Sequence, residues 1–236
     1  MSSIASTNKF HLIIQTNSPG ELANWVHSII KTCKEQSPTA KITLFLTPCQ
    51  YASGKEVEFA KEIPEITTVY SPKETIRHIF SLPIFIPKTE RGAVLFLGGD
   101  PLYSKLLGFK YKYPVFGYTE HKRKLGFYTF FKNEIGDLMA DKIRFYHQNK
   151  SPIKKTYYPK EVHRLVFFGG SRPAHFNAFV PFISQVIKEI NKLEDNYYSV
   201  IQISPFINDD HINEIKDKLP KEKTAVKKEN SQEKIL

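Results

Sequence analysis

Short runs of β-branched and aromatic residues alternate along this chain with segments whose apolar residues recur every three or four positions. Runs of the first kind predict strands, and segments of the second kind predict amphipathic helices. Parallel strands need a long crossover, usually a helix, so this alternation predicts a parallel sheet wrapped by helices. We therefore expect an α/β protein with a Rossmann-like parallel sheet.

The pattern is strongest in residues 1–146, which we expect to form a Rossmann-like domain. The expected strands are Phe10–Gln15, Lys41–Thr47, Thr67–Tyr70, Ala93–Leu97, Pro114–Tyr118 and Lys142–Tyr146. The expected helices are Gly20–Lys34, Lys55–Glu62, Lys73–Leu82 and Leu102–Phe109.

The pattern stops and then restarts in the last third of the chain. Residues 147–163 are polar and lack periodicity, which predicts a linker. The elements expected after it are strands Arg164–Phe168 and Tyr198–Ile203 and helices Ala174–Leu193 and Asp209–Leu219. Two strands leave much apolar surface of a sheet uncovered, so we expect residues 164–220 to form an incomplete second Rossmann-like unit. Residues 221–236 are charged and poor in apolar side chains, which predicts a solvated tail.

The net charge and the cysteine and histidine content limit the classes of ligand that the chain is expected to bind. The chain has 34 Lys and Arg against 24 Asp and Glu, a formal net charge of +10, which favours phosphorylated substrates, acidic lipid or nucleic acid. Cys33 and Cys49 predict neither a disulfide framework nor a metal pair, and the histidines lack ligand spacing, so no metal site is expected. No export signal or membrane-spanning stretch is recognisable, so we expect a cytoplasmic protein with peripheral membrane contact at most.

A glycine turn follows the first strand of the second unit. After Phe168 come Gly169, Gly170, Ser171 and Arg172, and then the next expected helix. Glycines allow a close approach of the backbone, N–H groups at a helix start favour an anion, and an arginine adds a bidentate contact. The turn therefore predicts a phosphate site. The alternative is a plain strand-to-helix turn in which the serine caps the helix.

Two carboxylates follow glycines at the carboxyl ends of other expected strands, where open α/β sheets bind ligands. Gly20 permits close approach to the chain, and Glu21 beside it is a candidate base or sugar-hydroxyl ligand. Gly99 lies in a similar turn, and Asp100 is a candidate general base for an acceptor hydroxyl. Helix capping is the alternative for both acids. Two residues at another strand end are reserve candidates for acid–base or substrate contacts: Glu120 and His121.

Aromatic residues are interleaved with cations between positions 103 and 132. Such a surface suits an anionic bilayer, with rings among the headgroups and cations on phosphates. The candidate membrane-surface residues are Lys110, Lys112, Lys122, Arg123, Lys124, Phe127, Phe130 and Phe131. Core aromatics with solvated cations are one alternative, and nucleic-acid binding is another. No nucleic-acid motif accompanies the segment, so we rank nucleic acid below lipid.

These turns resemble those of lipid-A-disaccharide synthase and its related proteins, which are GT-B glycosyltransferases with two Rossmann-like domains. The resemblance implies that residues 1–146 form the acceptor-side domain and residues 164–220 part of the donor-side domain. Glu21 falls in the place of the family's amino-terminal acid, although Pro19 departs from the pattern. Asp100 lies where the family has an acid after its fourth strand. Arg172 falls on the functional arginine of the carboxyl-terminal domain, with Gly169 in place of a proline. The similarity is greatest to the synthase-related branch.

The resemblance implies transfer of an acylated glucosamine from a UDP donor to a lipid-linked, phosphorylated sugar, with inversion at the anomeric carbon and without a cofactor. It also implies that the reaction takes place at the inner face of the cytoplasmic membrane. Asp100 or Glu21 would deprotonate the acceptor, while Arg172 and the preceding amides would stabilise the departing diphosphate. The family's donor-binding segment has no counterpart before Leu236, which predicts a piece of a longer enzyme or a loss of catalysis. A non-catalytic module that binds phosphorylated sugar or anionic lipid is the alternative.

Overall fold

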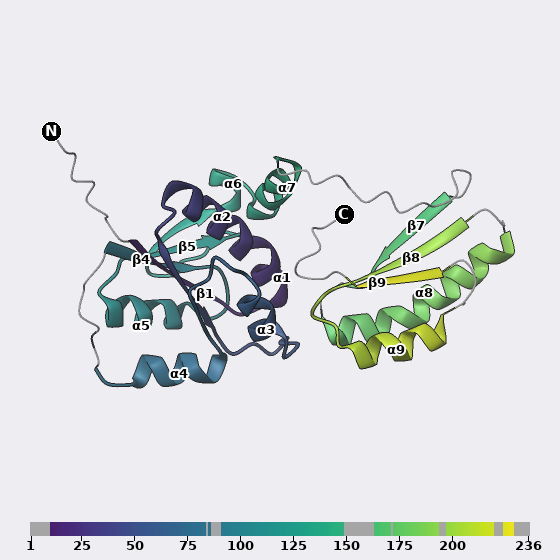
Figure 1. Ribbon diagram of the computed structural model, residues 1–236, viewed down its shortest axis with the longest axis horizontal. Coiled ribbons are helices and arrows are strands. Elements are labelled where there is room, and N and C mark those ends of the chain that lie inside the picture. Colours follow the sequence, from purple (N-terminus) through teal and green to yellow (C-terminus); the bar gives the residue numbers. More distant parts are fainter. Residues whose placement is uncertain are drawn as a thin grey trace. The chain divides into compact units, whose positions relative to one another are not determined.

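The chain has two compact units, each with its own parallel sheet (Figure 1). The computed structural model describes residues 10–83, 85, 91–148, 163–170, 172–193, 197–219 and 224–228. The first unit comprises Met1–Ala52 and Glu56–Gln148, and the second comprises Ser53–Lys55 and Asn149–Leu236. The expected fold class, a Rossmann-like parallel sheet followed by a smaller parallel sheet, is confirmed.

The first unit is built on six parallel strands in the order β3-β2-β1-β4-β5-β6. The strands are β1 (Phe10–Thr16), β2 (Lys41–Leu46), β3 (Thr68–Tyr70), β4 (Arg91–Phe96), β5 (Val115–Thr119) and β6 (Tyr128–Phe131). The chain winds outward from β1 to β3 and then returns to the other side of β1 with β4. The direction of winding therefore reverses between β1 and β4, where open α/β sheets place their ligand crevice.

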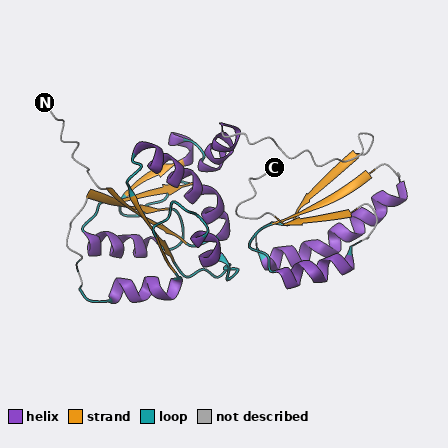
Figure 2. Ribbon diagram, viewed as in Figure 1, coloured by secondary structure: helices purple, strands orange, loops and turns teal. Residues whose placement is uncertain are grey.

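Helices cover this sheet (Figure 2). They are α1 (Pro19–Glu21), the π-helical turn η1 (Leu22–Val26), α2 (His27–Gln36), α3 (Glu56–Lys61), α4 (Pro72–Phe80), α5 (Pro101–Tyr111), α6 (Lys132–Ile135) and α7 (Leu138–Gln148). Every residue of β1 after Phe10 is buried, whichever face of the sheet it points to. Burial on both faces is typical of a central strand in a parallel sheet that lies between two layers of helices.

Two elements of the first unit differ from the sequence expectation. Lys142–Tyr146, expected as a strand, lies within α7, where Arg144 forms an i,i+3 ion pair with Asp141 at 3.2 Å. The run alternates basic and apolar residues, which is typical of a strand, but here it continues the helix that begins at Leu138. The strand β6 arises instead within the aromatic and basic segment, because its aromatic residues pair in parallel with β5.

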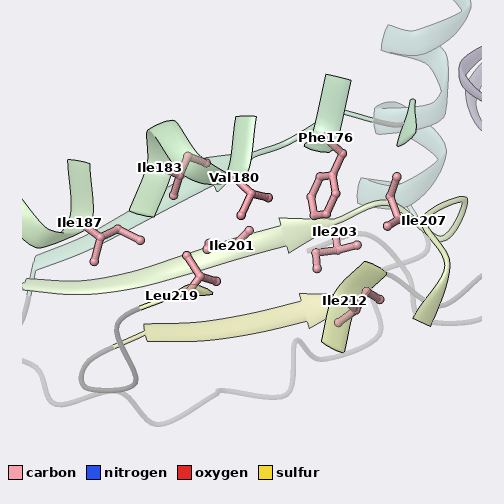
Figure 3. Packing of buried hydrophobic residues seen from close by; sticks show 9 residues of the cluster. All are labelled: Phe176, Val180, Ile183, Ile187, Ile201, Ile203, Ile207, Ile212 and Leu219. Carbon is pink, nitrogen blue, oxygen red and sulfur yellow. The ribbon is translucent and has the colours of Figure 1, made fainter. Parts of the chain in front are cut away.

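The second unit has three parallel strands in the order β7-β8-β9, with α8 (Pro173–Leu193) and α9 (Asp209–Lys218) on one face. The strands are β7 (His163–Phe168), β8 (Tyr197–Ile203) and β9 (Thr224–Lys228). Figure 3 shows the cluster of buried hydrophobic residues in its core, which is mostly aliphatic. The members of this cluster are Phe176, Val180, Ile183, Ile187, Ile201, Ile203, Ile207, Ile212 and Leu219.

The strand β9 lies in the segment expected as a solvated tail, so that expectation is wrong for Thr224–Lys228. This run is short and rich in lysine, which hides its strand character in the sequence. β8 supplies the backbone partners from Ser199 to Ile203, and Val226 packs against the core. Tertiary pairing thus overrides a weak local preference. Residues 221–223 and 229–236 of the expected tail and 149–162 of the expected linker lie outside the described residues.

Candidate functional site

The reversal of winding brings three strand ends together in the first unit. The Leu97 N–H donates to the Gln15 carbonyl at 2.8 Å, which continues the pairing of β1 with β4 into the following turn. On the other side of β1, the Thr47 N–H donates to the Thr16 carbonyl at 3.0 Å. The ends of β2, β1 and β4 therefore meet at one place. We call it the β1/β4 crevice, because open α/β sheets bind ligands at such a reversal of winding.

Glu21 enters this crevice from the first turn of α1. Its N–H donates to Ser18 Oγ at 3.4 Å, and its Oε2 accepts from the Ser18 N–H at 3.3 Å. This is a capping box, so the capping alternative holds for this turn. The Thr16 hydroxyl also donates to Oε2, at 3.3 Å. The carboxyl group is thereby held against the end of β1.

Gly98 lies directly on the Glu21 carboxyl group. A Cβ at Gly98 would overlap the carboxyl carbon and both oxygens, and its φ of +150° is one that other residues rarely adopt. Burial raises the pKa of Glu21, although hydrogen bonds from Ser18, Thr16 and Asn17 oppose the rise. A carboxylate with a raised pKa is a better proton acceptor at neutral pH than an ordinary one.

Beneath the turn lies a buried polar network that sequence patterning does not single out. Gln15 is 0% exposed. Its Nε2 donates to the Gly98 carbonyl at 2.5 Å and to Thr47 Oγ1 at 3.2 Å, while its Oε1 accepts from Ser104 Oγ at 2.6 Å. The one available signal is an amide near the end of an otherwise apolar strand, since a buried amide needs partners.

Asp100 lies in the same turn as Gly98 but has a different environment. It is exposed, and its Oδ1 accepts from the Leu102 N–H at 2.8 Å, which caps α5. Gly99, with φ +86°, packs against Asn17 and Thr47, so this turn also abuts the one after β1. At Gly20, an added Cβ would meet no described atom within 4 Å, so open space adjoins the start of α1.

Glu120 and His121 follow β5, which lies beyond β4 from β1. Both are exposed, and the Thr119 hydroxyl donates to the His121 carbonyl at 2.8 Å. They lie at the same edge of the sheet as Glu21, with the end of β4 in between. The structure therefore groups Glu21 with Gly98, Gly99 and Asp100 more closely than with these reserve candidates.

The glycine turn of the second unit has a packing role in its first residue. Gly169 is buried, and an added Cβ would overlap the ring of Phe176. Gly170 has φ +78°, a left-handed conformation that favours glycine. The Arg172 carbonyl accepts from the Phe176 N–H at 3.0 Å in the first turn of α8. Ser171 lies outside the described residues, and phosphate binding by this turn stays a prediction.

One candidate for the membrane surface is corrected by its burial. Lys110 is 3% exposed, and its Nζ donates to the carbonyls of Ser81 at 2.8 Å and Pro83 at 2.9 Å. It lies three residues after the buried Leu107, so the helical period turns it inward. The other candidate cations are exposed: Lys112, Lys122, Arg123 and Lys124. The candidate aromatics are half-buried: Phe127, Phe130 and Phe131.

A different apolar surface is exposed on α4, α5 and the segment between them. Its members are Ile76, Phe80, Leu82, Phe85 and Phe109, with Leu82 the most exposed at 83%. The rings of Phe85 and Phe109 lie 4.9 Å apart, and Lys112 Nζ lies 4.9 Å from the Phe85 ring. We call this set the α4/α5 apolar surface.

Within the described part of the chain, His, Cys, Asp and Glu nowhere gather in a group of three or more that could hold a metal ion. None of the helices in this part combines the length and the apolar character that crossing a membrane requires.

No protein-family model and no curated protein matches this sequence. Among solved structures, the chain is similar to E. coli heptosyltransferase WaaC with ADP, at 12% identity and a TM-score of 0.47, covering 95% of this chain and 76% of that one. For a family 9 glycosyl transferase from Veillonella parvula, identity is 11%, TM-score 0.43 and coverage 94% and 70%. For a putative UDP-N-acetylglucosamine 2-epimerase from Listeria monocytogenes, identity is 10%, TM-score 0.49 and coverage 94% and 69%.

Proposed function

We propose that this chain belongs to a glycosyltransferase of the lipid-A-disaccharide synthase type, which transfers an acylated glucosamine from a UDP donor to a lipid-linked, phosphorylated sugar. The observation that carries the proposal is the half-buried Glu21 carboxyl group, which lies against Gly98 where the winding of the first sheet reverses. The motif resemblance around Glu21, Asp100 and Arg172 supports the choice of reaction.

In the proposed reaction, Glu21 accepts the proton of the acceptor hydroxyl as its oxygen attacks the anomeric carbon. The new glycosidic bond forms on the face opposite the leaving group, and UDP departs with the electron pair of the broken bond. The raised pKa of Glu21 suits this task because a stronger base takes the proton more readily. Asp100 is the weaker candidate, because its exposed carboxyl group caps α5 and is not covered by the Gly98 turn.

The negative charge of the departing diphosphate needs positive groups to stabilise it. The candidates for this role lie in the second unit. Gly170 has the left-handed backbone conformation of a tight turn. Arg172 directly precedes α8, a helix of 21 residues. N–H groups and the dipole at a helix start stabilise phosphate charge, and a guanidinium adds a bidentate partner. We assign the diphosphate to this turn as part of the proposal.

The acceptor is lipid-linked in this proposal, so we also propose peripheral contact with an anionic membrane through the α4/α5 apolar surface. Exposed rings at this surface lie beside a cation, Lys112 over Phe85, an arrangement suited to lipid headgroups. The buried Lys110 donates hydrogen bonds to the carbonyls of Ser81 and Pro83 and so links α5 to the segment that carries Leu82.

Turnover of a UDP-linked acylated glucosamine with a phosphorylated, lipid-linked acceptor tests the reaction. Glu21→Gln is expected to lower turnover by about 10²- to 10⁴-fold, the usual contribution of a general base. Glu74→Gln is the matched control, because Glu74 occupies an equivalent capping box on α4 but is exposed. Donor binding without turnover by the unaltered chain would overturn the reaction and favour the binding module.

Sedimentation with vesicles tests the membrane contact. Vesicles containing phosphatidylglycerol should bind the chain, and Leu82→Ser should weaken binding about tenfold, since burying one leucine contributes at least about 1.5 kcal/mol. Ile143→Ser on α7 changes an equally apolar side chain that is 55% exposed and should have little effect. Equal losses in both variants would contradict the assigned surface.

A further inference from the structure

The side chain of Gln15 links three elements around the β1/β4 crevice. Its Nε2 reaches Gly98 O in the turn after β4 and Thr47 Oγ1 after β2, and its Oε1 accepts from Ser104 of α5. The orientation of the amide is fixed, because the reversed amide would set two carbonyl oxygens against each other at Gly98. Gln15 is wholly buried, so it does not meet a ligand itself.

Gly98 needs an external anchor if it is to stay in place. Its φ of +150° and the absence of a side chain leave its peptide many alternative conformations. The hydrogen bond from Gln15 to its carbonyl, together with the pairing of Leu97 to β1, selects the one in which Gly98 lies on Glu21.

We infer that Gln15 is a positioning residue for the β1/β4 crevice, whose amide holds the Gly98 carbonyl and so keeps the Gly98 peptide pressed against the Glu21 carboxyl group. This inference rests on the proposed role of Glu21 as the base. Gln15 acts through Gly98, and Ser104 in turn holds the amide of Gln15.

The chemical consequence of this anchor is a drier carboxyl group. While Gly98 stays on Glu21, water is kept from one side of the carboxyl oxygens, which disfavours the ionised form. When the anchor is lost, the turn relaxes, water enters and the ionised form gains. Glu21 then becomes a weaker base, although neither its own side chain nor its capping box has been altered.

The test is an NMR titration of ¹³C-labelled glutamate carboxyl groups in the full chain, with the Glu21 signal assigned from Glu21→Gln. Gln15→Met keeps the length of the side chain and removes its donors and acceptor. The Glu21 midpoint is expected to move to lower pH in this variant. Ser104→Ala removes only one hydrogen bond from the network and should give a smaller shift in the same direction, so it decides the matter if Gln15→Met does not fold.

Thr43→Val is the matched control for loss of a buried hydrogen bond. It removes the 2.8 Å contact between His11 Nε2 and Thr43 Oγ1, nearer the amino end of the same strands. It should lower stability and leave the Glu21 midpoint unchanged. An unchanged midpoint in a folded Gln15→Met protein, or an equal shift in Thr43→Val, would overturn the inference.

The titration requires neither donor nor acceptor, so it separates the inference from the proposed reaction. If the unaltered chain shows no turnover while Gln15→Met still shifts the midpoint, the proposed function fails and the positioning role stands. If turnover depends on Glu21 while Gln15→Met leaves the midpoint in place, the function stands and the positioning role fails.

Discussion

Two helices of the first unit begin with the same sequence pattern, Ser-Pro-x-Glu, and their glutamates differ in chemistry. Ser18 and Glu21 form a capping box at α1, and Ser71 and Glu74 form one at α4. The hydrogen bonds from Ser71 lower the pKa of the exposed Glu74. At α1, burial under Gly98 outweighs the same kind of hydrogen bonds and raises the pKa of Glu21. A capping box alone therefore lowers the pKa of its glutamate, and only a glutamate that the neighbouring turn also covers has a raised pKa.

Placing a side chain on the turn that covers Glu21 should have the largest effect. Gly98→Ala adds a Cβ where the Glu21 carboxyl group lies, so the carboxyl group must move away. We expect turnover to fall about a hundredfold or more, and stability by about 1–3 kcal/mol because of the φ of +150°. Turnover assays and urea unfolding measure the two effects.

Gly136→Ala is the control for backbone strain. Gly136 also has a positive φ, +101°, but no described atom lies within 4 Å of its added Cβ. It should lose stability to a similar extent and keep its turnover. If Gly98→Ala retained full turnover, the contact between Gly98 and Glu21 would have no chemical role.

A buried histidine on β1 should dominate the pH dependence of stability. Its contribution should exceed those of Glu21 and Glu74. Burial, and then the nearby charge of Lys41, lower the pKa of His11 from 6.5 to about 4. The unfolded chain therefore binds the proton first, so stability falls as the pH drops from about 6.5 to about 4. The loss should be about 2–3 kcal/mol, at roughly 1.4 kcal/mol per pKa unit.

Chemical denaturation across this pH range should show a flatter profile for His11→Gln, which does not titrate. A profile as steep as that of the unaltered chain would mean that another group, such as His27 or His78, is responsible. Burial also lowers the pKa of both of these histidines.

Removing the capping serines should have a smaller effect that is similar at both helices. Ser18→Ala and Ser71→Ala should each cost about 1 kcal/mol of stability, the usual value for a helix cap. Each removes the serine side-chain hydrogen bond that favours the ionised glutamate and keeps the one from the serine backbone N–H, so the pKa of each partner glutamate should rise. Unfolding and NMR titration of the two variants check this, and a fall in the Glu21 midpoint would contradict it.

Replacing the glutamates themselves should give the smallest changes in stability, and these should have opposite signs. A raised pKa means that Glu21 contributes stability below its unfolded pKa and loses it as the pH rises, so Glu21→Gln should be the more stable protein at neutral pH. The lowered pKa of Glu74 gives the reverse, so Glu74→Gln should be less stable there. Unfolding in a His11→Gln background measures both, and changes of the same sign would contradict the comparison.

Much of the fold could be predicted from the sequence, because apolar periodicity and turn residues mark most elements within a few residues of their ends. The errors fall where tertiary contacts decide: β6 and β9 depend on a neighbouring strand, and Lys142–Tyr146 depends on the turn before it. The charge of Lys110 likewise conceals its burial, which follows from how α5 packs.

The candidate site divides along the same line. Glu21 and Asp100 could be found because each follows a glycine at a strand end. Gln15 and Ser104 could not, because they are 89 positions apart and only the parallel topology brings them together. The contrast between Glu21 and Glu74 is also invisible in the sequence, since both occupy the same local pattern and only one lies beneath a neighbouring turn.

The most direct test of the central claim is the ¹³C-carboxyl titration of Glu21 and Glu74 in the unaltered chain. The structure predicts a midpoint for Glu21 above the ordinary glutamate value and a midpoint for Glu74 below it. Two midpoints that coincide, or a Glu21 midpoint below that of Glu74, would contradict the assignment of Glu21 as the base of the β1/β4 crevice.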